Sequence, residues 1–188
     1  MDAEQPPRGD QDDTDAELLS AAAPFVQAAV FAALARDIPA IGDAWRRILP
    51  LGERTLLLAL TSLGDMATLG VPAPTAKRAW MPVVRHHETG EPVDPDAIEN
   101  AALAFVARFC AAATARDREA QRALVGALLA PAAEDEPNAA AEERVADAFA
   151  ILAQVAAQGI VRERVRRERT HQHPNARHRP NRGDQRKR

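Results

Sequence analysis

The chain has 188 residues, of which 46% are hydrophobic and 27% are charged, and its formal net charge is −3. Alanine alone supplies 42 residues, whereas there are 9 Gly, one Cys and no Tyr. This composition excludes a collagen-like chain, a disulfide scaffold and a large β-sandwich, and the length fits one domain of ordinary size. Alanine favours helix but adds little apolar area when it is buried. We therefore expect a closely packed helical bundle with a thin core.

The first 14 residues are acidic and contain prolines, which predicts a disordered head. Thr14 and Glu17 have the spacing of a capping box at the start of a helix. Pro24 should kink this helix or restart it as a first-turn residue. Residues 18–35 carry no charge, and this length is near the lower limit for a helix that spans a membrane. Their many alanines and polar interruptions favour a buried helix, so we expect no membrane span.

Two further helices are predicted in the first half of the chain. One covers residues 39–49 and carries Trp45 on its apolar side. The other covers residues 52–69 and carries four leucines on a wide face. Gly70, followed by a Val-Pro pair, is a strong signal for the end of that helix.

Residues 71–94 form a long connection that contains four prolines, and connections of this length are usually functional or disordered. Two short apolar runs with Gly90 between them indicate a small β-hairpin within residues 83–93. An apolar group precedes and overlaps this hairpin. It could plug the bundle or form an exposed surface for a partner, because aromatic anchors are enriched in interfaces. The group consists of Trp80, Met81, Val83 and Val84.

The fourth helix is predicted to start at Asp94-Pro95, which is a good pair for an N-cap and a first-turn residue. It should reach about Ala115. Asp117 could cap a fifth helix, or the fourth and fifth helices could be continuous.

The sixth helix is predicted to be capped by Asn138 and to be long, with a weak point at Gly159. It should continue beyond Val165, because Glu163 and Arg167 form a favourable pair four residues apart.

These elements predict a single all-α, alanine-rich bundle of five or six helices over residues 15–169. An acidic disordered head at residues 1–14 precedes the bundle, and a basic disordered tail at residues 170–188 follows it. Residues 1–17 carry seven acids and one Arg, and residues 162–188 carry eleven bases and three acids. The near-neutral total therefore hides two ends of opposite charge.

The basic end is the most distinctive chemical feature of the sequence. Arginine pairs well with phosphate, and phosphate binding releases counterions, so such binding would be sensitive to salt and largely independent of base sequence. The tail has no aromatic residue that could stack on bases. An acidic protein, the acidic head of the chain itself or only water could equally face it. The candidate anion-binding residues are Arg162, Arg164, Arg166, Arg167, Arg169, Arg177, Arg179, Arg182, Arg186, Lys187 and Arg188.

Two other groups of residues contain side chains that could carry chemistry. His86 and Glu88 could share one side of a strand, next to His87, but two ligands fall short of the three or four of a zinc site. We therefore predict no metal, no cofactor and no catalytic residue. Cys110 follows Phe109 on an apolar helix and is expected to be a buried structural thiol. A lone cysteine forms no intrachain disulfide, which fits a reducing compartment and a cytoplasmic location.

The expected function is that of a non-enzymatic helical module for protein interaction. It would bind a protein partner or a second copy as a homodimer, and its Arg-rich tail would tether it to an anionic partner. The alternative is an accessory protein that binds nucleic acid through the tail without sequence specificity. A third alternative is a small metal-binding or catalytic bundle around His86, His87 and Glu88.

Overall fold

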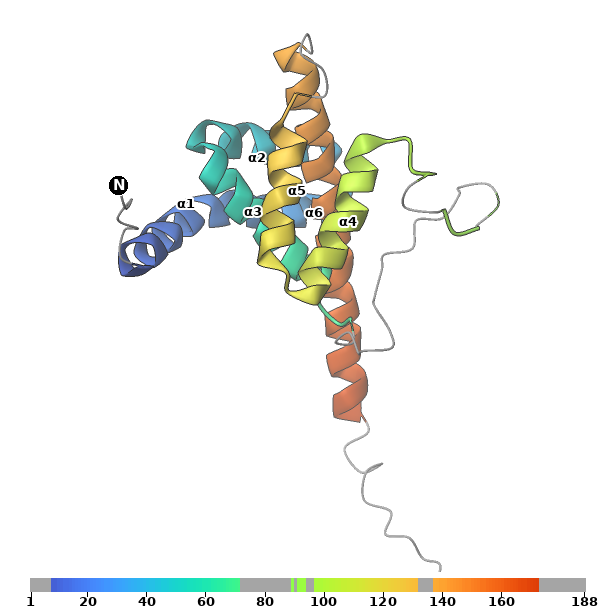
Figure 1. Ribbon diagram of the computed structural model, residues 1–188. Coiled ribbons are helices and arrows are strands. Elements are labelled where there is room, and N and C mark those ends of the chain that lie inside the picture. The colour runs from blue at the N-terminus through green and yellow to red at the C-terminus, as the bar shows by residue number, and fades with distance from the viewer. Residues whose placement is uncertain (1–7, 72–88, 90, 94–96, 132–136, 173–188) are drawn as a thin grey trace, which may run out of the picture.

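The computed structural model describes residues 8–71, 89, 91–93, 97–131 and 137–172. This part of the chain is all-α, with six α-helices and no strand (Figure 1). The predicted fold class, an all-α bundle of five or six helices, is thus confirmed. The predicted hairpin around Gly90 lies largely outside the described residues. The elements are α1 (Arg8–Ala35), α2 (Ile38–Ile48), the 3-10 turn η1 (Leu49–Leu51), α3 (Glu53–Ala67), α4 (Ala101–Ala115), α5 (Arg118–Leu129) and α6 (Asn138–Gln172).

The longest helix, α6, organises the bundle. It has 35 residues and packs against each of the other five α-helices. Helices α1, α2 and α3 also contact one another, and α4 and α5 form a second contacting pair. Figure 1 shows α6 passing through the bundle and leaving it at one end. The last turns of α6 therefore project from the bundle, and residues 164–171 are exposed.

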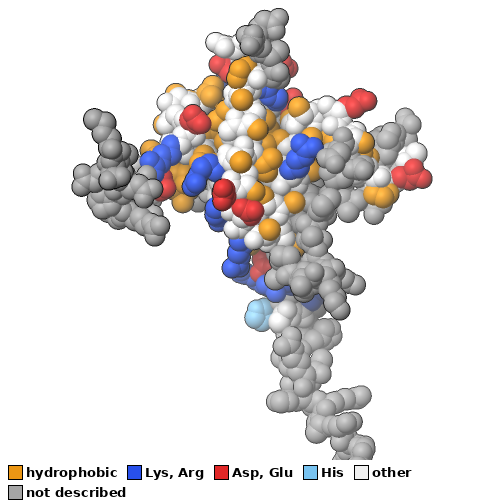
Figure 2. Space-filling model, in the orientation of Figure 1, with side chains coloured by type: hydrophobic (Ala, Val, Ile, Leu, Met, Phe, Trp, Pro, Cys, Tyr) orange, Lys and Arg blue, Asp and Glu red, His pale blue; other side chains and the backbone are white. Residues whose placement is uncertain are grey.

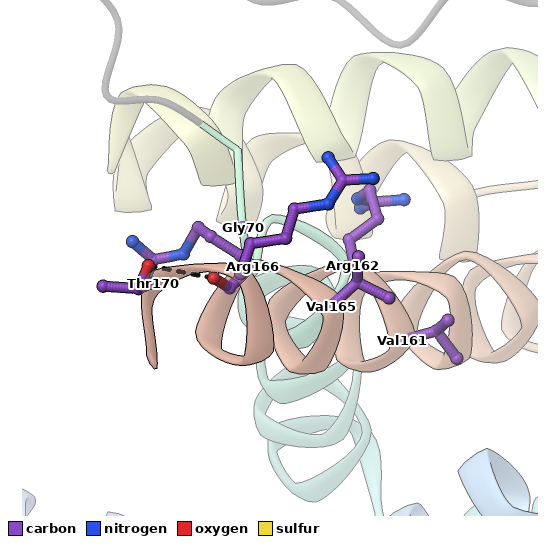
Figure 3. Close-up of a pocket in the computed structure, with 7 residues that line it drawn as sticks. Gly70, Val161, Arg162, Val165, Arg166 and Thr170 are labelled. Carbon is purple, nitrogen blue, oxygen red and sulfur yellow. Dashed lines mark hydrogen bonds between the residues drawn. The ribbon is translucent and has the colours of Figure 1, made fainter. Parts of the chain in front are cut away.

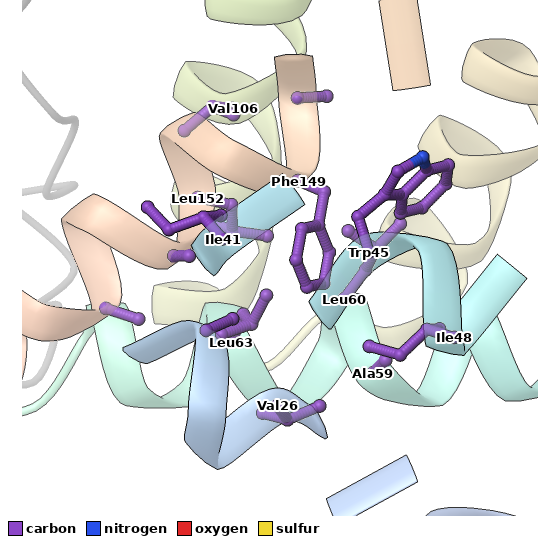
Figure 4. Close-up of a cluster of buried hydrophobic side chains, with 14 of the residues drawn as sticks. Val26, Ile41, Trp45, Ile48, Ala59, Leu60, Leu63, Val106, Phe149 and Leu152 are labelled. Atoms are coloured by element: carbon purple, nitrogen blue, oxygen red, sulfur yellow. The ribbon is translucent and has the colours of Figure 1, made fainter. Parts of the chain in front are cut away.

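The core combines a few large side chains with many alanines. Phe149 of α6 has no exposed surface and lies beside Trp45 of α2, with ring centroids 5.5 Å apart (Figure 4). Phe105 and Phe109 of α4 stack with centroids 5.1 Å apart. Because most of the remaining volume is filled by small residues, the large side chains contribute most of the apolar burial. The alanines with no exposed surface are Ala22, Ala29, Ala59, Ala67, Ala148, Ala153 and Ala156.

Two glycines let helices approach closely. A Cβ atom on Gly159 of α6 would overlap the backbone carbonyl oxygen of Met66 in α3. A Cβ atom on Gly64 of α3 would lie 2.8 Å from the ring of Phe109 in α4. The prediction that Gly159 is a weak point of α6 considered only helix propensity. In the fold this residue is where α3 and α6 come closest, so the missing side chain is a packing requirement.

The first helix differs from its predicted limits. It begins at Arg8, six residues before Thr14, and runs through Pro24 without a break. Proline removes one intrahelical hydrogen bond, but Pro24 lies on the exposed side, and the buried Ala22 and Val26 hold the opposite side against the bundle. Tertiary packing thus maintains a helix that the local signal would restart.

The start of the fourth helix was wrongly placed at Asp94-Pro95. Helix α4 begins at Ala101, and the side chain of Asn100 accepts a hydrogen bond of 2.8 Å from the backbone N–H of Leu103. Asparagine is as good an N-cap as aspartate, and Asp94 and Pro95 lie outside the described residues.

The alternatives for the fourth and fifth helices are resolved. Arg116 adopts a left-handed conformation, with φ +58°, and ends α4. Asp117 then caps α5 by accepting a hydrogen bond from the backbone N–H of Ala120 at 2.9 Å. Helix α6 continues past Val165, as predicted, but Asn138, the predicted cap, is its first helical residue, and the helix reaches Gln172, three residues into the predicted disordered tail.

We expect Gly159→Ala to destabilise the fold by about 3 kcal/mol, because the added methyl meets backbone rather than a movable side chain. Gly126→Ala in α5 is the matched control, since nothing lies within 4 Å of a Cβ atom there. That variant should gain about 0.5–1 kcal/mol from helix propensity. Urea denaturation measures both changes, and equal midpoints for the two variants would contradict the close approach of α3 and α6.

Candidate anion-binding surface at the end of the last helix

The predicted site residues divide into two groups. The arginines between Arg162 and Arg169 lie on the last described turns of α6. Figure 2 shows basic side chains gathered where this helix leaves the bundle. The other candidates lie outside the described residues. They are the anion-binding Arg177, Arg179, Arg182, Arg186, Lys187 and Arg188, the partner surface Trp80, Met81, Val83 and Val84, and the His86, His87 and Glu88 group.

Glu163 organises the arginines around it. Its carboxylate accepts hydrogen bonds from Arg166 at 2.7 and 2.9 Å and from Arg167 at 2.7 Å. The side chain is only 11% exposed, so it is held against the bundle. Hydrogen bonds from Arg166, followed by those from Arg167, lower the pKa of Glu163 to about 2. The predicted pair of Glu163 and Arg167 is therefore confirmed, and Arg166 joins it from one turn away.

Arg162 connects α6 to the end of α3. Its Nη2 donates a hydrogen bond of 2.5 Å to the backbone carbonyl of Ala67, the last residue of α3. A cation is favoured at the C-terminus of a helix, where carbonyl groups lack intrahelical partners. Gly70 follows with φ +75°, and a Cβ atom on it would lie 3.2–3.3 Å from the backbone of Arg162 and Glu163. The chain after α3 thus passes directly over this part of α6.

A hollow of about 580 Å³ lies along the outer side of this contact (Figure 3). Val161 and Val165 are 49% and 39% exposed there. Among the described residues its lining contains three arginines and no carboxylate. The surface therefore combines exposed methyl groups with positive charge. Its lining residues are Gly70, Val161, Arg162, Val165, Arg166, Arg169 and Thr170.

A second hollow, of about 600 Å³, lies on the other side of Gly70 and Arg166 and has mixed charge. Its two carboxylates are already paired. Asp65 accepts two hydrogen bonds from Arg118, at 3.1 and 2.8 Å, and Glu163 holds Arg166. The lining of this hollow has three arginines against two carboxylates, whereas the hollow beside Val161 has three arginines and no carboxylate among its described lining residues, so the latter is the better candidate for an anionic ligand.

The structure leaves fewer arginines free than the sequence suggests. Besides the contacts of Arg162, Arg166 and Arg167, Arg164 pairs with Glu168 at 3.0 Å. Among the described residues, the side chain of Arg169 makes no hydrogen bond or ion pair. Exposed ion pairs of this kind are weak, so an incoming anion can compete for them, but only Arg169 is available without exchange.

The arginines are recognisable in the sequence, whereas Val161, Val165 and Gly70 were not predicted to belong to a site. The two valines are four residues apart and lie on the same side of the helix. That spacing within an arginine-rich segment was a usable signal. The approach of Gly70 had no signal in the sequence, because residues more than ninety positions apart are brought together only by the packing of α3 on α6.

The described residues offer no metal centre, since no three His, Cys, Asp or Glu side chains gather in this part of the chain. Cys110 has no exposed surface, as expected for a structural thiol. Burial raises its pKa to about 12, so the reactive thiolate is disfavoured.

Comparison of the chain with protein-family models, with curated proteins and with solved structures finds no match.

We expect the carboxyl of Glu163 to titrate with a midpoint of about 2 instead of its ordinary 4.5. Since the pKa falls on folding, the ionised carboxylate stabilises the fold above about pH 4.5, and this contribution is lost as the pH drops toward 2. Carboxyl carbon shifts in NMR spectra measure the midpoint. Arg166→Ala should raise it more than Arg167→Ala does, and a midpoint near 4.5 in the unchanged protein would contradict the pairing.

We expect Cys110 to be inert toward a thiol reagent such as Ellman's reagent at pH 8 in the folded protein. Burial excludes the reagent, and the raised pKa keeps the sulfur protonated. Full reaction should follow addition of urea. Rapid reaction of the native protein would mean that α4 is not packed as described.

Proposed function

We propose that the protein is a non-enzymatic association module whose α6 end tethers it to an acidic, partly apolar segment of a protein partner. The hollow beside Val161 carries this proposal. Its arginines supply charge for carboxylates, and its valines supply a surface for aliphatic side chains. A ligand with both kinds of group would use the whole surface.

The energetics favour such a mixed ligand over a purely charged one. An exposed ion pair contributes about 0–1 kcal/mol, so charge alone gives weak binding to the described arginines. Covering apolar surface contributes about 25 cal/mol per Å². The exposed methyl groups of Val161 and Val165 therefore add affinity and select for a ligand with aliphatic side chains.

The nucleic-acid alternative uses less of this surface. A phosphate backbone engages arginines but offers no aliphatic partner to the two valines. Four of the five described arginines of the α6 end also have partners in the fold already. This observation favours the protein partner.

Fluorescence anisotropy with three labelled probes tests the proposal. The probes are a peptide of glutamates and leucines, a poly-glutamate peptide of equal charge, and a DNA duplex. We expect the glutamate–leucine peptide to bind most tightly. Val161→Thr keeps the side-chain shape but replaces one methyl group with a hydroxyl. It should lower the affinity for that peptide by about tenfold, because an unpaired polar group is then buried in the complex. Binding of poly-glutamate should not change.

The charge component has its own matched pair of variants. Arg169→Ala should lower the affinity for both peptides by about two- to fivefold, which is the factor expected for the loss of an exposed ion pair. Arg164→Ala removes the same charge from a position outside the hollow and should have little effect. Tightest binding of the duplex, unaffected by Val161→Thr, would favour the nucleic-acid alternative instead. Equal effects of Arg169→Ala and Arg164→Ala would mean that only total charge matters.

A further inference from the structure

Helix α1 has an apolar side that nothing in the described part of the chain covers. Ala22, Val26 and Ala29 face the bundle and are at most 3% exposed. On the opposite side Phe31 is 68% exposed and Leu34 is 44% exposed. An exposed phenylalanine within an apolar stretch is unusual for a helix that has solvent as its only neighbour.

The charges of α1 are confined to the two ends of this stretch. From Leu18 to Ala35 the helix has no charged residue. Of the most apolar 18 residues between Thr14 and Ala35, only 22% are buried. Glu17 stands before the stretch and Arg36 after it, and both are exposed. Neither forms an ion pair with another described residue.

We propose that this side of α1 is the interface of a homodimer, in which the α1 helices of two copies pack antiparallel across a two-fold axis. In such an isologous contact each residue pair occurs twice. An antiparallel arrangement brings Glu17 of one copy beside Arg36 of the other. The same register places Gln27 next to the two-fold axis.

Size complementarity supports the same register. Phe31 then lies opposite the part of the second helix around residues 20–24, where Ser20, Ala21 and Pro24 present small exposed side chains. A large side chain on one copy thus meets a shallow surface on the other, and the reverse contact is equivalent. A parallel arrangement would instead place Glu17 beside Glu17 and Phe31 beside Phe31.

The expected affinity is modest. The uncharged stretch of 18 residues is about 27 Å long, and one helix face of that length covers less than the area of a standard stable interface, about 800 Å² per partner. A dissociation constant in the micromolar range is therefore expected. The dimer does not depend on the proposed function, but it would present two α6 ends in one particle and strengthen a tether through avidity.

Sedimentation equilibrium of the full chain between about 1 and 100 µM tests the dimer. We expect Phe31→Glu to raise the dissociation constant by about thirtyfold or more, as for a central anchor residue. Leu51→Glu is the matched control: its side chain is 39% exposed on η1, outside the proposed interface. It should leave the dimer unchanged.

Charge reversal tests the register. Glu17→Arg and Arg36→Glu should each weaken the dimer, and the double variant should recover it because the pairs are restored with opposite sign. A parallel dimer would show no such recovery, and that result would overturn the arrangement.

Cross-linking gives an independent test, because the buried Cys110 does not compete. Gln27→Cys should form an intermolecular disulfide on mild oxidation, since residue 27 of each copy lies near the axis. Ser20→Cys should not, because the two positions would be about 20 Å apart along the helices. A disulfide requires Cα atoms within about 7 Å.

Two results would overturn the proposal. One is a monomer at every concentration in the sedimentation experiment. The other is a monomer that co-sediments with phosphatidylcholine vesicles and loses this binding in Phe31→Glu, because the apolar side would then serve a lipid surface.

Discussion

The arrangement of the bundle depends on the close approach of α3 and α6 at Gly159. Only a residue without a side chain leaves room there for the backbone of Met66. Small residues at a crossing bring helix axes together, and the large side chains then interdigitate on either side. On one side this contact leads to Leu63 and Leu152 in the core. On the other it leads directly to the arginine-rich end of α6.

The same contact converts a run of arginines into a defined surface. Once the end of α3 lies on α6, Arg162 reaches the carbonyl of Ala67, and Glu163 is pressed against the bundle. A poorly exposed carboxylate requires cations near it, and Arg166 and Arg167 supply them. The hollow beside Val161 is the surface left between these committed arginines and the chain at Gly70. Its shape thus follows from core packing and not from the tail itself.

The alanine content explains why apolar surface remains on the outside. Small residues allow many helix contacts but bury little apolar area at each of them. The apolar area of the core therefore comes mainly from the few large side chains that point into it. The core takes Phe149, Trp45 and Phe109, whereas Phe31 and Leu34 point away from it. The exposure of Phe31 and Leu34 is the observation behind the proposed dimer contact on the outer side of α1.

The sequence by itself determined the helices and their approximate limits. Helix propensity, apolar period and caps such as Asp117 are local properties, so α2, α3, α5 and the length of α6 could be predicted from neighbouring residues alone. The arginine cluster and the buried nature of Cys110 could be recognised in the same way. Local signals were wrong about the start of α4, which is at Ala101 and not at Asp94-Pro95, and the restart of α1 that Pro24 allowed does not occur.

Only the tertiary structure decided how these residues are used. Gly159 has a low helix propensity, but the packing of α6 on α3 requires a residue without a side chain there. The sequence does not indicate this requirement, because Met66, which lies against Gly159, is distant in the chain. Arg162 and Arg169 are chemically identical in the sequence, but Arg162 is bound to the end of α3, whereas Arg169 lines the hollow beside Val161 and has no side-chain partner among the described residues. The uncharged run of α1 was expected to be buried, and the bundle covers one side of it only. In each case the deciding interaction joins residues that are far apart in the chain. Neighbouring residues in the sequence do not indicate which distant segment will pack against a given side chain.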